Sequence, residues 1–307
     1  MLKIKSWIDA MRLRTLPLSV SGIIIGSGMA ALLDKWDTLI FLLAILTTIS
    51  FQILSNFSND LGDSQKGSDN NNRIGPKRTV QAGLISKKEM KVGILIFTIL
   101  SLIFSGSLIY VSIANLSKEL IYFYAGLALS CVLAAITYTI GKRAYGYHGF
   151  GDLMVFLFFG LVSTLGVFSL YGEGFQWLVL LPAITVGLWS TAVLNLNNLR
   201  DHENDKQSKK NTLVVSMGFE KAKYYHGFLI ILGLSFWFVS VLVISALTYN
   251  ILLFVALIPS ISLIFHLKRV FQTSEPKDLD PELKKVALIT FFSSLIFALV
   301  INLIKPN

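Results

Sequence analysis

Nine long apolar runs constrain the fold of this chain more than any other feature of its sequence. Each has close to the ~20 residues that a helix needs to cross the hydrocarbon core of a bilayer. They lie at 15–34, 38–57, 92–114, 119–140, 153–171, 176–197, 224–247, 250–267 and 286–304. The chain is 54% apolar and 15% charged, whereas soluble domains carry roughly 25% charged residues. We therefore predict an all-α, multi-pass membrane protein with nine transmembrane helices in one domain, 1–307.

Lysine and arginine are distributed unevenly between the segments that join these runs. If the N-terminus is cytoplasmic, 24 of the 27 basic residues fall on the cytoplasmic side, and the exceptions are Lys35, Lys118 and Lys305. This bias is typical of membrane proteins, whose cytoplasmic loops collect basic residues. We predict a cytoplasmic N-terminus and an external C-terminus. The net charge of +9 is then explained without a nucleic-acid partner.

The N-terminal segment, Met1 to Arg14, is basic and amphipathic, and no small-residue cleavage site follows it. It predicts an interfacial helix on the cytoplasmic surface and not a cleaved signal peptide. In the first apolar run, Gly22 and Gly26 are four residues apart. Small residues at this spacing let two helices pack closely, and we interpret them as a helix contact.

An acidic and amide-rich segment follows the second apolar run. Carboxylates crowded together repel one another unless a cation joins them. Oxygen ligands suit Mg²⁺, which leaves coordination positions for water and phosphate. If the helix continues past Leu54, four of these side chains share one face and a fifth follows: Asn56, Asn59, Asp60, Asp63 and Asp69. We predict a divalent-metal site here, with a solvated acidic loop as the alternative.

A basic loop comes directly after this acidic segment. It contains Arg73, Lys77 and Arg78 beside a glycine and a proline. A metal can bridge phosphate oxygens while fixed cations neutralise the remaining charge. The loop therefore indicates a phosphorylated anion, although the positive-inside bias alone would also place basic residues here.

A second acidic cluster ends the sixth apolar run. Asn198, Asp201 and Asp205 recur at helical spacing and so share one face. Asn198 follows Asn56 by 142 residues, and Asp205 follows Asp63 by the same number. This equal spacing raises the hypothesis of an internal duplication. Two such clusters at one membrane edge indicate a site for a metal-bound diphosphate, with a hydrocarbon tail among the helices.

The short loop between the fourth and fifth runs combines Tyr138, Lys142 and Asp152. An aromatic interfacial belt with snorkelling cations would explain the first two. Asp152, however, precedes a strongly apolar span, where an acid is costly unless it has a function. His202 and His266 have no acid at metal-ligand spacing, so we interpret both as structural. The last three spans read as scaffold.

The pattern resembles the UbiA-type intramembrane aromatic prenyltransferases over essentially the whole chain. The stretches that carry the resemblance are WIDAMRLRTLP (7–17), NDLGDSQKGSDNNNRIGPKR (59–78), YTIGKRAYGYHGFGDLMVFLFFG (138–160) and NNLRDHENDKQSKKNTL (197–213). Within that family the chain is most similar to the branch that prenylates 1,4-dihydroxy-2-naphthoate for menaquinone biosynthesis. Two departures concern loops: no proline follows Gly141, and Lys209 stands where many members have glycine.

The resemblance implies a helical chamber open to the cytoplasmic side, in the cytoplasmic membrane, and roles for particular residues. Mg²⁺ would be the cofactor, and polyprenyl diphosphate and an aromatic acid the substrates. The metal and diphosphate would be bound by Asn56, Asn59, Asp60, Asp63, Asn198, Asp201 and Asp205, with Asp69 as a further candidate. Lys77, Arg78 and Lys142 would hold diphosphate oxygens, Arg12 would face the aromatic acid, and Asp152 and Tyr138 would line the chamber near the reacting carbon.

The implied reaction joins the prenyl group to the naphthoate ring with loss of carbon dioxide and gives demethylmenaquinol. Other acceptors within the family are 4-hydroxybenzoate, homogentisate and haem B. A divalent-cation transporter is a more distant alternative, because transporter sites usually lie near the bilayer midplane on broken helices. A CDP-alcohol phosphotransferase would need an Asp-x-x-Asp-Gly-x-x-Ala-Arg motif, which the sequence lacks. The oligomeric state and the prenyl chain length are left open.

Overall fold

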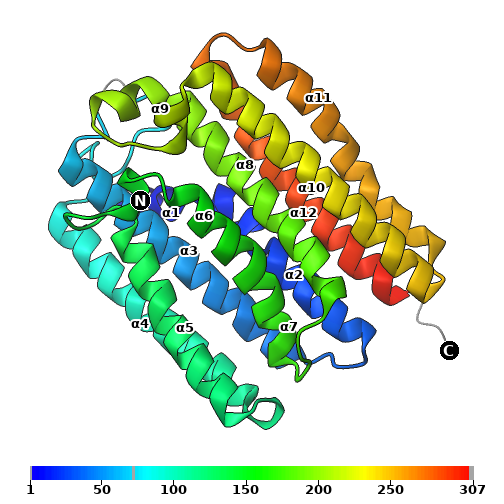
Figure 1. Ribbon diagram of the computed structural model, residues 1–307. Coiled ribbons are helices and arrows are strands. Elements are labelled where there is room, and N and C mark those ends of the chain that lie inside the picture. The colour runs from blue at the N-terminus through cyan, green and yellow to red at the C-terminus, as the bar shows by residue number, and fades with distance from the viewer. Residues whose placement is uncertain (1, 71–72, 304–307) are drawn as a thin grey trace.

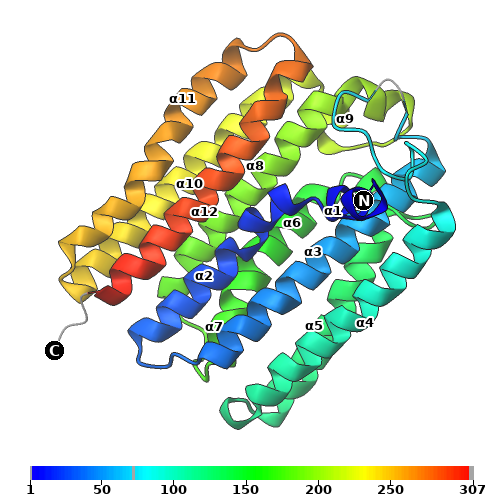
Figure 2. The same cartoon turned by 180° about the vertical axis from the view of Figure 1, so that it is seen from behind.

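The computed structural model describes residues 2–70 and 73–303, and this part of the chain forms a bundle of helices (Figures 1 and 2). Within it, nine helical segments are long and apolar enough to cross a membrane, which confirms the predicted number. They are Lys3–Leu32, Thr38–Lys66, Lys87–Val111, Lys118–Thr137, Gly151–Leu170, Trp177–Gln207, Phe219–Thr248, Ile251–Gln272 and Pro276–Leu303.

Most spans consist of one helix and some of several. The α-helices are α1 (Leu2–Met11), α2 (Leu16–Leu32), α3 (Thr38–Lys66), α4 (Lys87–Val111), α5 (Lys118–Thr137), α6 (Gly151–Val155), α7 (Val167–Leu170), α8 (Trp177–Gln207), α9 (Leu213–Met217), α10 (Phe219–Thr248), α11 (Ile258–Gln272) and α12 (Asp280–Leu303). Short helical turns are η1 (Leu13–Thr15), η2 (Ile113–Asn115), η3 (Tyr145–Tyr147), η5 (Ile251–Leu257) and η6 (Pro276–Leu279). The fifth span contains a π-helix, η4 (Phe156–Gly166).

Two helices continue well beyond the apolar runs that predicted them. The runs end at residues 57 and 197, whereas α3 ends at Lys66 and α8 at Gln207. Hydropathy marks where a chain leaves the hydrocarbon, but a helix continues until its backbone is capped. In α3 that cap is Gly67, whose φ of 77° is favourable only for glycine. Apart from Asp69, both acidic clusters therefore lie on helices, at what we call the polar end of the bundle.

Figure 2 shows α1 at the polar end as a separate helix, joined to α2 by the turn η1. Its Trp7 ring lies 5.3 Å from the Phe57 ring of α3. Gly93 of α4 accommodates this indole, since a Cβ there would lie 2.8 Å from a Trp7 ring carbon. The predicted N-terminal helix is present, and its place at a membrane surface stays a prediction.

The spans are packed closely at glycines. A Cβ on Gly26 would lie 2.4 Å from the Thr164 carbonyl oxygen of η4, and one on Gly22 would clash with Ser163. The glycine pair of α2 is thus a helix contact, as predicted. η4 is equally close to α8, because a Cβ on Gly160 would lie 2.5 Å from the Gly187 Cα. The π-helix is held between α2 and α8, and π-helical turns are frequent at functional sites.

The views in Figures 1 and 2 place α4 and α5 along one edge of the bundle and α10, α11 and α12 along the opposite edge. The largest core cluster contains Trp189, Trp237 and Phe297, which join α8, α10 and α12. A smaller cluster around Phe57 joins α1, α3 and α4. Between these two packed regions the interior is hollow.

Candidate active site

A cavity of about 540 Å³ is lined by residues of helices α2 to α8, η4 included, and of α12. Its deep walls are largely apolar and include Leu18, Ile23, Leu108, Leu127 and Leu170. At the polar end of the bundle its lining becomes charged, with Arg12, Arg73, Asp63, Arg78 and Lys210. The same compartment therefore has a charged end and a hydrocarbon-like end.

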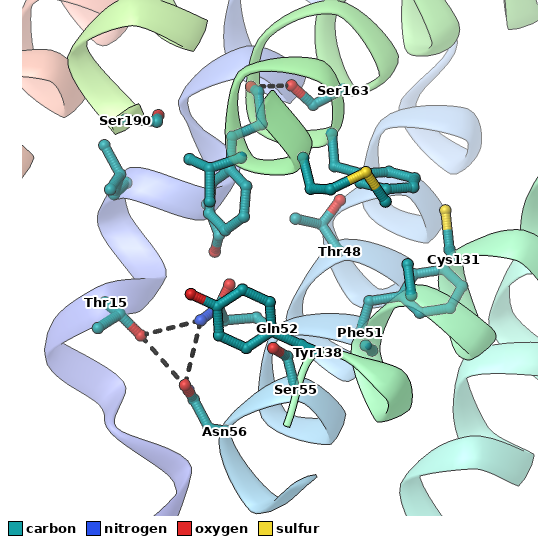
Figure 3. A pocket seen from close by; sticks show the side chains of 18 of the residues that line it. Thr15, Thr48, Phe51, Gln52, Ser55, Asn56, Cys131, Tyr138, Ser163 and Ser190 are labelled. Carbon is teal, nitrogen blue, oxygen red and sulfur yellow. Dashed lines mark hydrogen bonds between the residues drawn. The ribbon is translucent and has the colours of Figure 1, made fainter. Parts of the chain in front are cut away.

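Figure 3 shows side chains that line this cavity, among them Thr15, Gln52 and Asn56. Gln52 donates to Thr15 Oγ1 and to Asn56 Oδ1, both at 3.4 Å. Arg12 donates to Asn56 Oδ1 at 3.4 Å and to its carbonyl oxygen at 3.3 Å. Arg12 has a φ of 53°, which is uncommon for a residue with a side chain. Such strain is often found at functional sites, and here it occurs where an arginine lines the cavity.

Asp63 lies in the last turn of α3 with its carboxylate on the cavity. Tyr147 donates its hydroxyl to Asp63 Oδ1 at 2.8 Å, and Lys210 Nζ lies 4.0 Å from Oδ2. Gly62 lets the segment after α5 approach, because a Cβ there would lie 2.5 Å from Thr139 Oγ1. Both Tyr147 and Lys210 were missed as site residues by sequence reasoning.

Lys210 links the two acidic clusters. Its ammonium lies between Asp63 and Asp205, 3.9 Å from Asp205 Oδ1, and it is buried. Burial alone would lower the pKa of Lys210, but the two carboxylates outweigh it and raise that pKa. Lys209 makes the turn that presents it, with a φ of 58°, a backbone conformation that glycine adopts more readily than lysine.

Arg73 makes the second link between the clusters. Its Nε lies 3.4 Å from Asp69 Oδ1 and its Nη2 lies 3.3 Å from Asp201 Oδ2. Arg200 binds the same Asp201 with two nitrogens, at 3.0 Å and 2.7 Å. The Gly75 amide also donates to Asp201 Oδ1, at 3.3 Å. The acidic clusters of α3 and α8 thus meet, as predicted, with arginine and lysine between them.

Asp60 has different surroundings from Asp63. It does not line the cavity, and its carboxylate accepts three hydrogen bonds from the start of a turn: Thr79 N at 3.1 Å, Thr79 Oγ1 at 2.6 Å and Val80 N at 3.3 Å. Arg78, next to this turn, does line the cavity. The geometry therefore makes Asp60 an anchor for the loop that carries Arg78.

We expect Asp60→Asn to weaken binding of a diphosphate substrate more than it slows turnover. Loss of charge-assisted hydrogen bonds, each worth ~1.5–3 kcal/mol, frees the loop that carries Arg78. The measurement is steady-state kinetics, with KM for the diphosphate rising about tenfold. Thr79→Val removes one of the same hydrogen bonds. The KM of the double variant should therefore rise by less than the product of the two single-variant increases. A changed Mg²⁺ requirement in Asp60→Asn would instead make Asp60 a metal ligand.

The remaining predicted residues divide into those near the cavity and those away from it. Asn59 and Tyr138 line it, and burial raises the pKa of the Tyr138 phenol to about 12. Asp152 is buried in α6 without lining the cavity. Lys77 and Lys142 are exposed and do not line it, because their loops direct them outward. The structure brings Arg73 and Lys210 to the site in their place.

Several buried oxygen atoms in the site have no hydrogen-bond partner. They are both carboxylate oxygens of Asp69, Oδ2 of Asp205 and Oδ1 of Asn198. Buried polar atoms are normally satisfied, and this oxygen-only set suits Mg²⁺. Among the described residues, no three acidic, histidine or cysteine side chains converge on one point. Diphosphate oxygens and water would have to complete the coordination of an ion here.

The pKa of Asp69 provides a test that needs no substrate. Burial raises it, neighbouring Arg78 lowers it, and the result is about 6 against an ordinary value of 3.8. A carboxyl group with a raised pKa in the folded state makes the protein less stable as pH rises through that pKa. We expect Asp69→Asn to raise the free energy of unfolding of the metal-free protein by ~1–3 kcal/mol at pH 7.5, measured as a higher thermal unfolding midpoint. At pH 4 the variant and the parent should coincide. If Asp69→Asn lowered the unfolding midpoint equally at pH 7.5 and pH 4, the raised pKa of Asp69 would be contradicted.

An apolar cavity enclosed by membrane-spanning helices, with a charged end where cations contact buried carboxylates, defines a class of protein. Such a compartment fits an amphiphile with an anionic head and a hydrocarbon tail, held where water is scarce. The class is therefore that of integral membrane proteins that bind and process charged lipids.

Comparison with known proteins narrows this class. The sequence pattern of the UbiA prenyltransferase family matches residues 19–301, and the chain belongs to this family. It is 39% identical to 1,4-dihydroxy-2-naphthoate octaprenyltransferase of Haemophilus influenzae, over 97% of this chain and 96% of that protein. The enzyme of the same name from Escherichia coli is 42% identical over 74% and 73%.

A solved structure confirms the fold. The UbiA homolog from Archaeoglobus fulgidus, described as bound to GPP and Mg²⁺, superimposes with a TM-score of 0.68. The superposition covers 97% of this chain and 100% of that one at 15% identity. The protein is thus a multi-pass membrane prenyltransferase.

Proposed function

We propose that this enzyme transfers a polyprenyl group from polyprenyl diphosphate to 1,4-dihydroxy-2-naphthoate, with loss of carbon dioxide, and so makes demethylmenaquinol. The observation that carries the proposal is the cavity itself, whose walls are apolar and whose charged end is lined by Asp63, Arg73 and Lys210. Arg73 and Lys210 also contact the second aspartate cluster, through Asp201 and Asp205. Relatives that are 39% and 42% identical bear the name of naphthoate octaprenyltransferases. We place the enzyme in the cytoplasmic membrane with its N-terminus cytoplasmic, from the distribution of basic residues.

The diphosphate head would bind at the charged end of the cavity. Lys210, Arg73 and Arg78 form ion pairs with carboxylates in this structure, and with a diphosphate present they would neutralise phosphate oxygens. Mg²⁺, held with the diphosphate by Asp63, Asp69, Asp205 and Asn198, would supply charge that stabilises the leaving group. The prenyl tail would lie along the apolar wall towards Leu108 and Leu170.

The chain's own residues prepare the donor for ionisation. Breaking the C–O bond leaves an allylic cation and a diphosphate, so the cations at Lys210, Arg73 and Arg78 stabilise the developing negative charge. They are held in place beforehand by the aspartates, which limits reorganisation during the reaction. The apolar walls exclude water, which would otherwise capture the cation.

The acceptor would bind beside this centre, where Arg12 is held by Asn56. An arginine at this place suits the carboxylate of an aromatic acid. The ring carbon that bears the carboxyl group attacks the allylic cation, and carbon dioxide then leaves as the aromatic ring is restored. Tyr138 lines the same part of the cavity.

The acceptor is tested by competition among ring systems. Purified enzyme is given one polyprenyl diphosphate, Mg²⁺, and an equimolar mixture of 1,4-dihydroxy-2-naphthoate, 4-hydroxybenzoate and homogentisate. Mass spectrometry should find the naphthoate product in clear excess. If the 4-hydroxybenzoate product dominated, the proposed prenyl-transfer site would stand, but the proposed acceptor would be wrong. Haem B, supplied separately, should give no product.

A further inference from the structure

A second cavity, of about 560 Å³, lies between α11 and α12, at the edge of the bundle opposite α4 and α5 (Figures 1 and 2). Its lining has two parts. Aromatic, aliphatic and serine side chains form one: Pro259, Ser262, Phe265, Leu288, Ile289 and Phe292. Charged and polar side chains at the polar end form the other: His266, Arg269, Glu282 and Lys285. We call it the outer groove. None of these residues lines the active-site cavity.

The charged part of the outer groove is organised around the buried carboxylate of Glu282. Its Oε2 lies 2.7 Å from His266 Nδ1, and its Oε1 lies 3.3 Å from Arg269 Nε and 2.5 Å from Lys285 Nζ. His266 in turn contacts His226 of α10, with the two Nε2 atoms 2.8 Å apart. His266 thus has an acidic partner, which its sequence spacing did not predict, because the antiparallel helices α11 and α12 bring the two together.

One carboxylate does not balance two cations. The side chains of Arg269 and Lys285 are 57% and 50% exposed, while Glu282 is buried. Each cation uses one nitrogen on Glu282 and retains further donors that face outward. The polar end of the outer groove therefore has a net positive charge and free hydrogen-bond donors, which suits an anion.

The rest of the outer groove suits a hydrocarbon chain. Phe265 and Phe292 are 71% and 47% exposed on the outer face of membrane-spanning helices. From Pro259 to Arg269 the groove follows eleven residues of α11, whose ten steps rise by about 15 Å along the helix. This equals half of a hydrocarbon core that is ~30 Å thick. The groove thus extends through one leaflet, with its cations at headgroup depth.

We propose that the outer groove is a binding site for an anionic phospholipid. Its phosphate would bind Arg269 and Lys285, and an acyl chain would lie against Phe265 and Phe292. Basic pockets between transmembrane helices recognise lipid headgroups in this way. Charge complementarity and the length of one leaflet favour a lipid over a second copy of the chain. The proposal does not depend on the identity of the prenyl acceptor.

Native mass spectrometry of the full-length protein in detergent tests this site. The protein is titrated with phosphatidylglycerol and separately with phosphatidylcholine. We expect one saturable phosphatidylglycerol adduct, whose affinity falls about tenfold in R269Q/K285Q. The matched control K221Q/K268Q removes two exposed cations from the same end outside the groove and should bind like the parent.

Two further measurements test the proposal even if the R269Q/K285Q protein is unstable. Ser262→Trp fills the apolar part of the groove without touching the charged part and should also lose the adduct. Inorganic phosphate should not compete at concentrations that saturate the lipid. The proposal is overturned if phosphatidylcholine binds equally, if phosphate alone competes, if both groove variants retain the adduct, or if a protein dimer occupies the groove.

Discussion

Asp63→Asn is expected to reduce prenyl transfer by about a thousandfold, the largest effect of any single substitution in this enzyme. Asp63 is the carboxylate of the first cluster that lines the cavity, and both Tyr147 and Lys210 are oriented by it. The asparagine keeps the shape and can still accept from Tyr147, but it removes the charge that a metal–diphosphate complex needs. Initial rates with saturating donor and Mg²⁺ provide the measurement.

Glu203→Gln is the matched control for Asp63→Asn. Glu203 lies between the two aspartates of α8, but it is exposed and outside the cavity. The Glu203→Gln enzyme should keep at least about half of the parent activity, since exposed substitutions away from structural features have small effects. Both variants should unfold at temperatures close to that of the parent in detergent. If Asp63→Asn retained near-parental turnover, Asp63 would have no part in activating the donor.

Lys210→Gln is expected to lower kcat/KM for the donor by about a hundredfold and also to destabilise the metal-free protein. The reason for the second effect is that Lys210 is the cation between Asp63 and Asp205. Without it two buried carboxylates face each other, and loss of one partner of a buried pair costs ~3 kcal/mol. Kinetics and thermal unfolding, each without and with Mg²⁺, measure the two effects.

Mg²⁺ distinguishes the two roles of Lys210. Added metal and diphosphate should restore most of the lost stability, because they supply positive charge between the same carboxylates, while activity stays low. Lys206→Gln removes an exposed lysine from the last turn of α8 and should change neither quantity. A Lys210→Gln protein with parental activity would show that the link between the clusters is structural only.

The sequence was sufficient to predict the number of spans and the meeting of the two acidic clusters. The first follows from the length of the apolar runs. The second follows from the orientation of the spans, which places both helix ends at the same membrane edge. The extra turns of α3 and α8 were not predictable from hydropathy, since they lie beyond the apolar runs and depend on caps such as Gly67. The π-helix η4 likewise has no signal in an unbroken apolar run.

The sequence did not predict which basic residues contact the aspartates of the site. Basic residues are abundant at this membrane edge for reasons of orientation, so no single one stands out. Lys142 and Lys77 are exposed, while Lys210 and Arg73 contact the aspartates. That choice is made by tertiary turns, such as the one at Lys209 with its positive φ. Asp60 and Asp63 differ for a similar reason, because only Asp60 meets the distant Thr79.

The most direct test of the proposed function is the mass of the product formed by purified enzyme from 1,4-dihydroxy-2-naphthoate and a polyprenyl diphosphate. With Mg²⁺, we predict a product equal to the acceptor plus one prenyl group minus carbon dioxide. Chelation of the metal, or Asp63→Asn, should abolish it. A product that retains the carboxyl group, a yield unchanged by chelation, or the absence of any prenylated naphthoate would contradict the account.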